Sequence, residues 1–370
     1  MSENEHLNKN ENKNEIKPEK ENEANKINEE INKKEINKEI NKENIIIGKI
    51  FIYKNNSRKR IINSYRKEKD NEHIEEGNEK EIKECEIFIN NKKINFSYYY
   101  IFPKKGEYII KYIFKNLFKL TNYMFYECSS LIFLDLSNFK TENVTNMREM
   151  FSCCKSLISL NLSNFNTQNV TNMRKMFFDC RFLISLNLSN FNTQNVIDMR
   201  NMFRNCNSLT SLDLSNFNTQ NITDMSEIFS GCKSLNSLDL SSFNTQKVIS
   251  MRDMFCNCNS LTSLDLSNFN TQNVTTMRFM FYNCNSLTSL NLSSFNTQNV
   301  TNMKNMFFCC KAFKSLDLSH FNTQNVNNME FMFFDCNSLF SLDLSNFNTQ
   351  NVINMECMFD RCNSLLSLNL

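Results

Sequence analysis

Cysteine is the most reactive residue type in this sequence, and ten of the 15 cysteines recur at a fixed spacing. They stand 26 residues apart from Cys128 to Cys362, each three residues after the Phe of a Met-Phe or Ile-Phe pair. Thiols in CxxC pairs or beside histidine would predict zinc binding or redox chemistry. The sequence has no CxxC pair, and His6, His73 and His320 lie far apart. The spacing instead predicts one buried column of thiols.

Other residue types that enzymes require are scarce. Four glycines cannot form a Gly-rich phosphate-binding loop. A formal charge of +2 gives no field that attracts nucleic acid, and no run of apolar residues could span a bilayer. The region around His73 and Cys85 lacks catalytic spacing. We therefore expect a protein that is not an enzyme, with no cofactor, metal, nucleic-acid partner or transmembrane segment.

A repeat unit determines the fold. One copy begins with Leu209-Thr-Ser-Leu-Asp-Leu, in which Leu212 and Leu214 point to the same side of a strand. In another copy the apolar residues between Val170 and Cys180 recur at helical spacing, which predicts a short helix. Because one unit cannot bury its apolar side alone, the units must stack. We predict an α/β repeat solenoid, a leucine-rich-repeat-like stack with a parallel β-sheet on one side and short helices on the other.

The turns of the repeat contain almost no Gly or Pro. Each copy instead carries Asn-Thr-Gln-Asn or a close variant, as at residues 192–195. Asn tolerates positive φ, and its amide bonds to the backbone. We therefore expect this segment to supply the left-handed residues and to form polar ladders between units.

Composition divides the chain into three parts. Residues 1–45 are rich in Lys, Glu and Asn and are predicted to be disordered. Residues 46–116 read as a small antiparallel β unit that caps the solenoid. Residues 117–370 hold about ten repeats of 26 residues, and the array either continues or is uncapped at the C-terminus.

Alternation of apolar residues locates the strands of the β unit. Lys93–Phe102 and Glu107–Lys115 read as two strands joined by a turn at Pro103–Gly106. Cys85–Ile89 reads as an earlier strand, and Asn90-Asn91 as its hairpin turn. The stretch from Ser57 to Lys83 is rich in Lys, Arg and Glu and begins with the basic cluster Ser57–Arg60. It is either a solvated loop or a site for an anionic partner.

Function in a solenoid resides in columns of equivalent residues. One column points outward from the strands between serines and is the candidate partner-binding face: Asp135, Asn161, Asn187, Asp213, Asp239, Asp265, Asn291, Asp317, Asp343 and Asn369. It suits an extended partner, either a protein or a glycan. The alternative is that these residues only keep an exposed sheet soluble.

A second column, beside the first Met of each unit, forms a candidate basic stripe: Arg148, Arg174, Arg200, Arg252, Arg278 and Lys304. It becomes acidic at Glu330 and Glu356. The stripe could bind an anionic surface or allow side-by-side self-association, and the open end of the solenoid could allow end-to-end self-association. A solvated face is the alternative.

The unit Leu-Asp-Leu-Ser-Asn-Phe-Asn-Thr-Gln-Asn-Val-Thr-Asn-Met-x-x-Met-Phe-x-x-Cys resembles the repeats of BspA-like leucine-rich-repeat surface proteins over residues 117–370. The resemblance implies a surface or lipoprotein antigen that binds proteins, such as a host surface or matrix protein, in adhesion. The sequence as given shows no signal peptide, and free cysteines favour a reducing compartment. Two hypotheses remain, a surface adhesin and an intracellular scaffold that mediates protein–protein interaction.

Overall fold

An antiparallel β unit followed by a stack of coils makes up the described chain, residues 44–64 and 78–370, in a computed structural model. Residues 1–43 of the predicted disordered segment lie outside the described residues. The prediction is wrong for the last two residues of that segment, Asn44 and Ile45. Asn44 and Ile45 already pair with Phe114 and Ile113 at the start of a strand.

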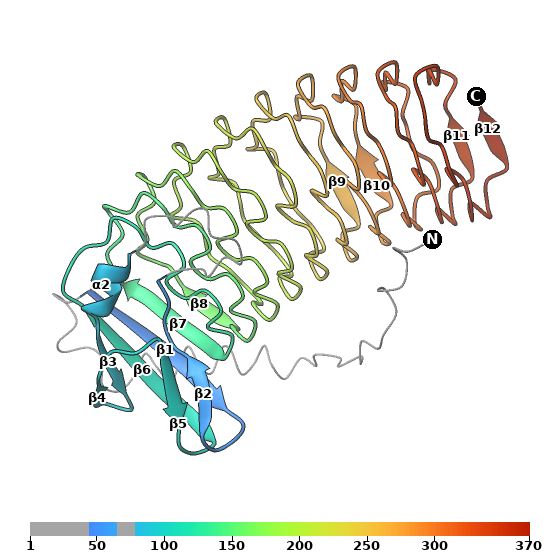
Figure 1. Cartoon of the computed structure of the whole chain (residues 1–370). Coiled ribbons are helices and arrows are strands. Elements are labelled where there is room, and N and C mark those ends of the chain that lie inside the picture. The colour runs from blue at the N-terminus through green and yellow to red at the C-terminus, as the bar shows by residue number, and fades with distance from the viewer. Residues whose placement is uncertain (1–43, 65–77) are drawn as a thin grey trace. The chain divides into compact units, whose positions relative to one another are not determined.

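One six-stranded sheet connects the β unit to the repeats (Figure 1). Its strand order is β4-β3-β6-β1-β7-β8. The strands are β1 (Asn44–Ile52), β3 (Glu86–Ile89), β4 (Lys92–Ile94), β6 (Gly106–Phe114), β7 (Leu131–Asn138) and β8 (Ser159–Asn161). β1 lies antiparallel to both β6 and β7. Because β7 belongs to the first repeat, the sheet continues from the β unit into the solenoid.

A two-stranded ribbon and a short helix complete the β unit. β2 (Ser57–Arg60) pairs antiparallel with β5 (Tyr99–Phe102), and α2 spans Glu79–Lys83. The predicted solvated stretch from Ser57 to Lys83 therefore contains a strand and a helix, while its residues 65–77 lie outside the described part of the chain.

Two strand predictions for the β unit are confirmed and one is wrong. β6 matches Glu107–Lys115, and β3 turns into β4 through Asn90 and Asn91, whose φ values are 47° and 63°. The single strand predicted at Lys93–Phe102 is two strands in different sheets, and β5 pairs with β2 rather than with β6. The chain leaves the sheet after Ile94, and Phe102 is fully buried with its ring centroid 4.8 Å from that of Tyr108.

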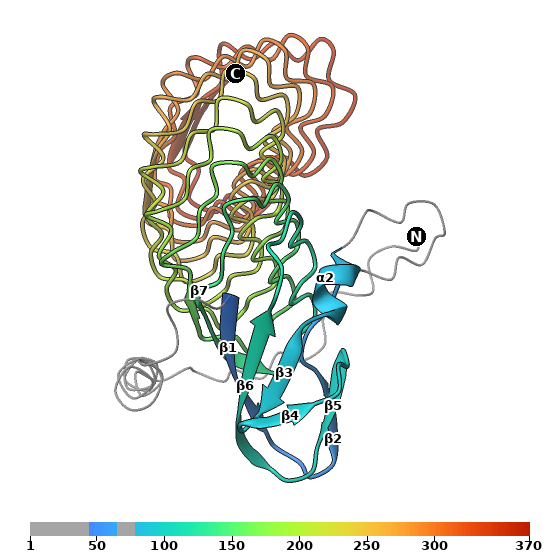
Figure 2. The ribbon, with the colours of Figure 1, turned by 90° about the vertical axis from the view of Figure 1, so that its left-hand side faces the viewer.

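Short parallel strands mark one side of the repeats. The strands are β9 (Ser263–Asp265), β10 (Ser289–Asn291), β11 (Ser341–Asp343) and β12 (Ser367–Asn369). β10 pairs with β9 and β12 with β11, each residue facing its equivalent one unit away. In Figure 2, which looks along the stack, successive coils overlie one another. The predicted parallel arrangement is confirmed, although the strands are only three residues long in these coils.

The predicted helices of the repeat are wrong, since α2 is the only helix in residues 44–64 and 78–370. In the coil with Met147 and Cys154, Met150 N–H donates to the Met147 carbonyl and Cys154 N–H to the Phe151 carbonyl. The third residue of each turn, Glu149 and Cys153, has a φ of 54° and 62°. These are features of two type II turns.

Hydrogen bonds between coils explain why turns replace the helix. Glu149 N–H donates to the Arg174 carbonyl of the next coil at 2.9 Å, and Phe151 N–H to the Met176 carbonyl at 3.0 Å. A helix would direct these N–H groups to carbonyls four residues earlier in the same coil. Two turns therefore replace the helix that the apolar spacing predicts. They point Met, Phe and Cys inward, and they leave backbone N–H groups free to bond to the next coil.

Positive φ falls on the turn residues rather than on Asn-Thr-Gln-Asn, which corrects the sequence prediction. The polar ladder expected at that segment is present. The Thr193 hydroxyl, fully buried, donates to the Asn218 carbonyl at 3.0 Å and accepts from Asn218 N–H at 2.7 Å. Equivalent Thr residues repeat this pair of bonds in neighbouring coils, as Thr167 and Thr219 do.

Candidate functional site

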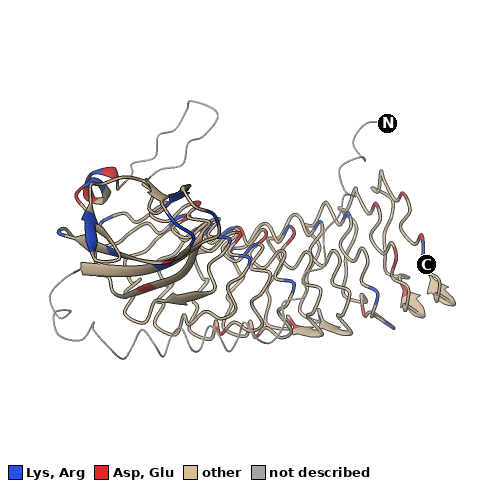
Figure 3. Cartoon of the chain, turned by 90° about the horizontal axis from the view of Figure 1, so that it is seen from below, with Lys and Arg blue, Asp and Glu red and all other residues tan. Residues whose placement is uncertain are grey.

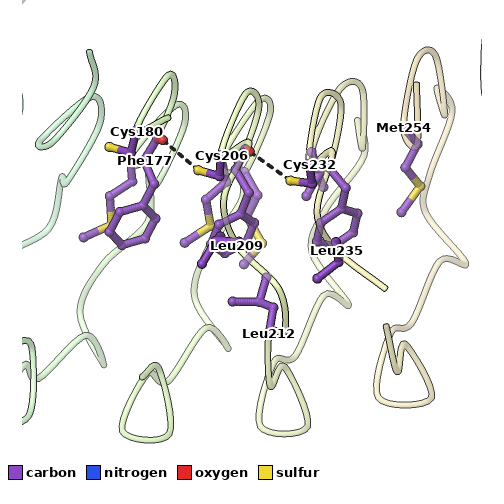
Figure 4. Packing of buried hydrophobic residues seen from close by; sticks show 14 of the residues in the cluster. Phe177, Cys180, Cys206, Leu209, Leu212, Cys232, Leu235 and Met254 are labelled. Atoms are coloured by element: carbon purple, nitrogen blue, oxygen red, sulfur yellow. Dashed lines mark hydrogen bonds between the residues drawn. The ribbon is translucent and has the colours of Figure 1, made fainter. Parts of the chain in front are cut away.

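The thiol column is a hydrogen-bonded part of the core. Cys206 Sγ donates to the Phe177 carbonyl at 3.1 Å, and Cys232 Sγ donates to the Phe203 carbonyl at 3.2 Å (Figure 4). Burial raises the pKa of Cys232 to about 12 and the pKa of Cys206 well above its ordinary value. A protonated, buried thiol is a poor nucleophile and a poor metal ligand. The column therefore supports structure rather than chemistry.

Two described cysteines outside the column, Cys85 and Cys357, also have raised pKa values. Burial raises the pKa of Cys85 to about 12, and His73 lies outside the described residues. Cys357 is exposed. Desolvation raises the pKa of its thiol, and the charges of Glu356 and Asp360 raise it further. Within residues 44–64 and 78–370, no group of His, Cys, Asp and Glu could hold a metal ion.

The predicted partner-binding face forms a continuous row on the strand side. Asp213, Asp239, Asp265, Asp317 and Asp343 are exposed. Asn187 and Asn291 are exposed in the same row, while Asp135 and Asn161 are half-buried near the β unit, where β1 pairs with β7.

The side chains of this face from Asp135 to Asp343 also hold the local backbone. Asp213 Oδ1 accepts the N–H of Ser215 at 3.0 Å, and Asp239 Oδ1 accepts the N–H of Ser241 at 2.9 Å. These bonds lower the pKa of both aspartates. Asn161 forms the same turn with Ser163 N–H, which shows why either Asp or Asn can occupy this column.

Where Asn follows Asp along the row, the amide bridges the two coils. Asn161 Nδ2 donates to Asp135 Oδ1 at 3.0 Å, and Asn369 Nδ2 donates to Asp343 Oδ1 at 3.1 Å. Asp213, Asp239 and Asp265 follow one another without an intervening Asn. None of these three carboxylates has an ion-pair partner in the part of the chain that the structure describes. This segment is therefore the most anionic part of the face.

The predicted basic stripe is largely neutralised within the chain. Arg200 pairs with Asp198 at 2.7 Å, Arg252 with Glu227 at 2.6 Å, and Lys304 with Glu330 at 2.9 Å. Arg148 Nε lies 3.5 Å from Glu149 Oε1. Arg278 lies over the ring of Phe279. The pKa of Asp198 is raised by burial but lowered more by the side chain and N–H of Arg200, and the charge of Arg174 adds a smaller lowering. The stripe consequently presents mixed charge rather than a cationic track (Figure 3).

Sequence reasoning missed an aromatic ladder on the turn side. The rings of Tyr282, Phe308 and Phe334 stack with centroids 4.6 and 4.7 Å apart. Phe331 lies against Phe308 and Phe334, and Arg361 lies over the Phe334 ring. The only signal was an aromatic residue at equal spacing in three consecutive coils, in a slot that is variable elsewhere and holds residues such as Ser230, Cys256 and Asp360. These rings are half-buried and stabilise the packing of consecutive coils.

Comparisons with known proteins give limited similarity. No curated protein matches the sequence. The crystal structure of a TLR13–ssRNA13 complex matches at 17% identity and a TM-score of 0.18, over 66% of this chain and 49% of that chain. The chain thus spans about half the length of that structure. The functional domain of InlJ from Listeria monocytogenes, which includes a cysteine ladder, matches at 14% identity and a TM-score of 0.18, over 67% of each chain.

Among the described residues no helix is both long and apolar enough to cross a bilayer.

Family membership comes from the repeats. A family model matches residues 119–212, 183–289, 208–313 and 286–369. These overlapping matches cover more than half of the sequence, and the chain therefore belongs to the family described as Mycoplasma protein of unknown function, DUF285.

Proposed function

We propose that the protein is a non-catalytic binding scaffold whose strand face, the Asp/Asn column with its flanking serines, holds an extended, cationic segment of a partner protein. The observation that carries this proposal is the run of exposed, unpaired carboxylates at Asp213, Asp239 and Asp265. Adjacent strands in a sheet lie about 4.8 Å apart, so equivalent groups recur at short, regular intervals. A partner with regularly spaced Lys or Arg complements such a row.

The geometry of each aspartate supports this role. One carboxylate oxygen accepts the N–H of the serine two residues later, as Asp265 does from Ser267 at 2.9 Å. This bond fixes the side chain, so little rotamer entropy is lost on binding. Asp317 is held in the same way by Ser319 N–H at 3.0 Å.

Replacing carboxylates by amides tests the proposal without disturbing the turns. D213N/D239N/D265N removes three charges, and Asn already forms the same turn at Asn161. Its matched control, E142Q/E356Q/D360N, makes the same charge change at exposed residues outside the column. A labelled peptide of alternating Thr and Lys serves as the probe, followed by fluorescence anisotropy with the full chain.

We expect the triple Asn variant to weaken peptide binding by about tenfold or more, because each charge pair on an exposed surface contributes up to about 1 kcal/mol. The control variant should bind like the parent protein. Equal weakening by both variants, or unchanged binding by the Asn variant, would contradict the proposal. Binding of neutral glycans by all three proteins would favour a glycan partner instead.

The cellular setting divides the proposal into two forms. The resemblance of the repeats to BspA-like surface proteins supports an adhesin, whereas the many unpaired thiols support an intracellular scaffold. Cys357 is exposed and reports on the difference. Labelling of Cys357 in intact cells by a membrane-impermeant maleimide, absent in C357S, supports the surface form. Labelling only after lysis supports the intracellular form.

A further inference from the structure

Two turns meet at one end of the β unit. Residues 53–56 connect β1 to β2, and residues 103–105 connect β5 to β6. Asn56 N–H donates to the Pro103 carbonyl at 3.3 Å, and Lys105 N–H donates to Asn55 Oδ1 at 2.8 Å. We call residues 53–56 and 103–105 the double-turn tip. Figures 1 and 2 both show it at the extremity of the β unit, away from the repeats.

The double-turn tip is cationic although the whole chain is nearly neutral. Lys54, Lys104 and Lys105 are exposed, and none forms an ion pair with a carboxylate of residues 44–64 or 78–370. The nearest acidic residue in sequence, Glu107, is paired with Lys49 at 2.9 Å. Arg58, one strand residue beyond the turn, is also exposed. The positive charge of the tip is therefore available to an external anion.

Large apolar side chains are exposed close in sequence to these lysines. Tyr53 is 81% exposed, Ile101 59% and Phe51 39%. The rings of Phe51 and Tyr53 meet edge to face at 4.9 Å, which holds Tyr53 outward. Aromatic rings with a polar atom are favoured at the boundary between water and the apolar part of a bilayer.

The aromatic ring beside Arg58 and Arg60, that of Tyr99, does not suit nucleic acid. Base stacking requires an open ring face. Arg58 and Arg60 lie over the Tyr99 ring, 4.4 and 4.6 Å from its centroid. Arg60 also bonds to the Tyr99 hydroxyl and lies 3.6 Å from Glu127. The tip combines free lysines with exposed apolar groups, which favours a lipid surface.

We propose that the double-turn tip docks on an anionic lipid bilayer, with Lys54, Lys104 and Lys105 at the headgroups and Tyr53 and Ile101 in the interface. This contact is peripheral, and it leaves the strand face of the repeats free for its own partner. Each lysine near an anionic membrane adds about fivefold to the partition coefficient, and the effect falls with ionic strength.

Vesicle co-sedimentation of the full chain tests the proposal. Vesicles of phosphatidylcholine with one third phosphatidylglycerol are compared with vesicles of phosphatidylcholine alone. We expect binding to the anionic vesicles only, a loss of about tenfold or more in K54E/K104E/K105E, and a smaller loss in Y53S/I101S. The matched control K92E/K119E/K140E makes the same charge change at exposed lysines elsewhere and should bind like the parent protein.

Circular dichroism and thermal unfolding check that the variants fold. Absence of binding by the parent protein, or equal losses in the tip variant and the control variant, would overturn the proposal. A single-stranded RNA added in place of vesicles provides the competing test. RNA binding that the tip variant abolishes, without a matching loss of vesicle binding, would assign the tip to nucleic acid instead.

Discussion

The thiol of Cys206 donates a hydrogen bond to the backbone carbonyl of Phe177, one coil earlier, with Sγ and O 3.1 Å apart. The same carbonyl accepts Cys180 N–H at 3.2 Å within its own coil. Cys258 and Cys284 repeat this bond to Phe229 and Phe255. A column of thiols thus joins consecutive coils without disulfides, and this explains why Cys recurs where a small apolar residue would otherwise suffice.

Replacing Cys206 by alanine should therefore destabilise the solenoid. The substitution removes a buried sulfur atom and leaves the Phe177 carbonyl with one bond fewer, for a cost of roughly 1–2 kcal/mol. The midpoint of urea unfolding, followed by circular dichroism, should fall. C357A alters an exposed thiol and is the control, and its midpoint should not change. Equal midpoints for C206A and the parent protein would contradict the role of this bond.

Thiol reactivity should separate the column from the exposed cysteine. Burial raises the pKa of Cys232 to about 12 and also that of Cys258, so their thiolates are negligible near pH 8. Ellman's reagent should react rapidly with Cys357 in the native protein and more slowly with the half-buried Cys153, Cys309 and Cys362. The nine buried cysteines of the column, Cys128 to Cys336, should react only in urea. C357S should remove the rapid phase. Rapid native labelling of the column, located by mass spectrometry, would show that the coils open.

Acid stability should depend on the aspartates of the strand face. The Ser N–H bonds hold the pKa of Asp213, Asp239 and Asp265 below the ordinary 3.8. A lowered folded pKa contributes stability that is present above about pH 4 and lost as pH falls through the folded values. The melting temperature of D213N/D239N/D265N should therefore fall less between about pH 4 and pH 2 than that of the parent protein. Parallel curves for the two proteins would refute this.

The buried Thr ladder should be sensitive to loss of a hydroxyl. Thr219 donates to the Asn244 carbonyl at 2.8 Å and accepts Asn244 N–H at 2.8 Å. Thr219→Val keeps the shape but leaves two buried backbone groups without partners, at a cost of about 2–4 kcal/mol. Thr223→Val, at an exposed position, is the control and should be nearly neutral. Thermal unfolding of both variants measures the difference, and equal melting temperatures would argue against the ladder.

The repeat period and the inward columns follow from the sequence alone. Leu, Met, Phe and Cys recur at equal spacing, and the structure buries these columns through most of the stack. The alternation of apolar residues also predicted β6 correctly. The local residue pattern determines which face of this strand is apolar, and β1 and β3 pair with its two edges. The repeat and this strand could be predicted since the deciding interaction, burial of apolar side chains, depends on residue type and period.

The candidate face could be predicted only in part. The exposure of Asp213 and Asp239 follows from their position between inward leucines. Their bonds to Ser215 and Ser241 were not predicted, nor was the pairing that neutralises Arg200 and Arg252. Pairing across coils depends on which side chains the stack places next to one another, and a single unit of sequence does not contain that information.

Only the tertiary structure decided the conformation of the segment from Met to Cys. Its apolar spacing fits a helix, yet Glu149 and Cys153 adopt positive φ and donate their N–H groups to the Arg174 and Phe178 carbonyls of the next coil. The equivalent of Cys153 in other coils is Asp179, Asn205, Gly231, Cys309 or Arg361, all with positive φ. The tolerance of Asp, Asn and Gly for positive φ fits Asp179, Asn205 and Gly231, but Cys309 and Arg361 have no such preference. The conformation is imposed by backbone hydrogen bonds between stacked coils, which exist only once the solenoid has formed.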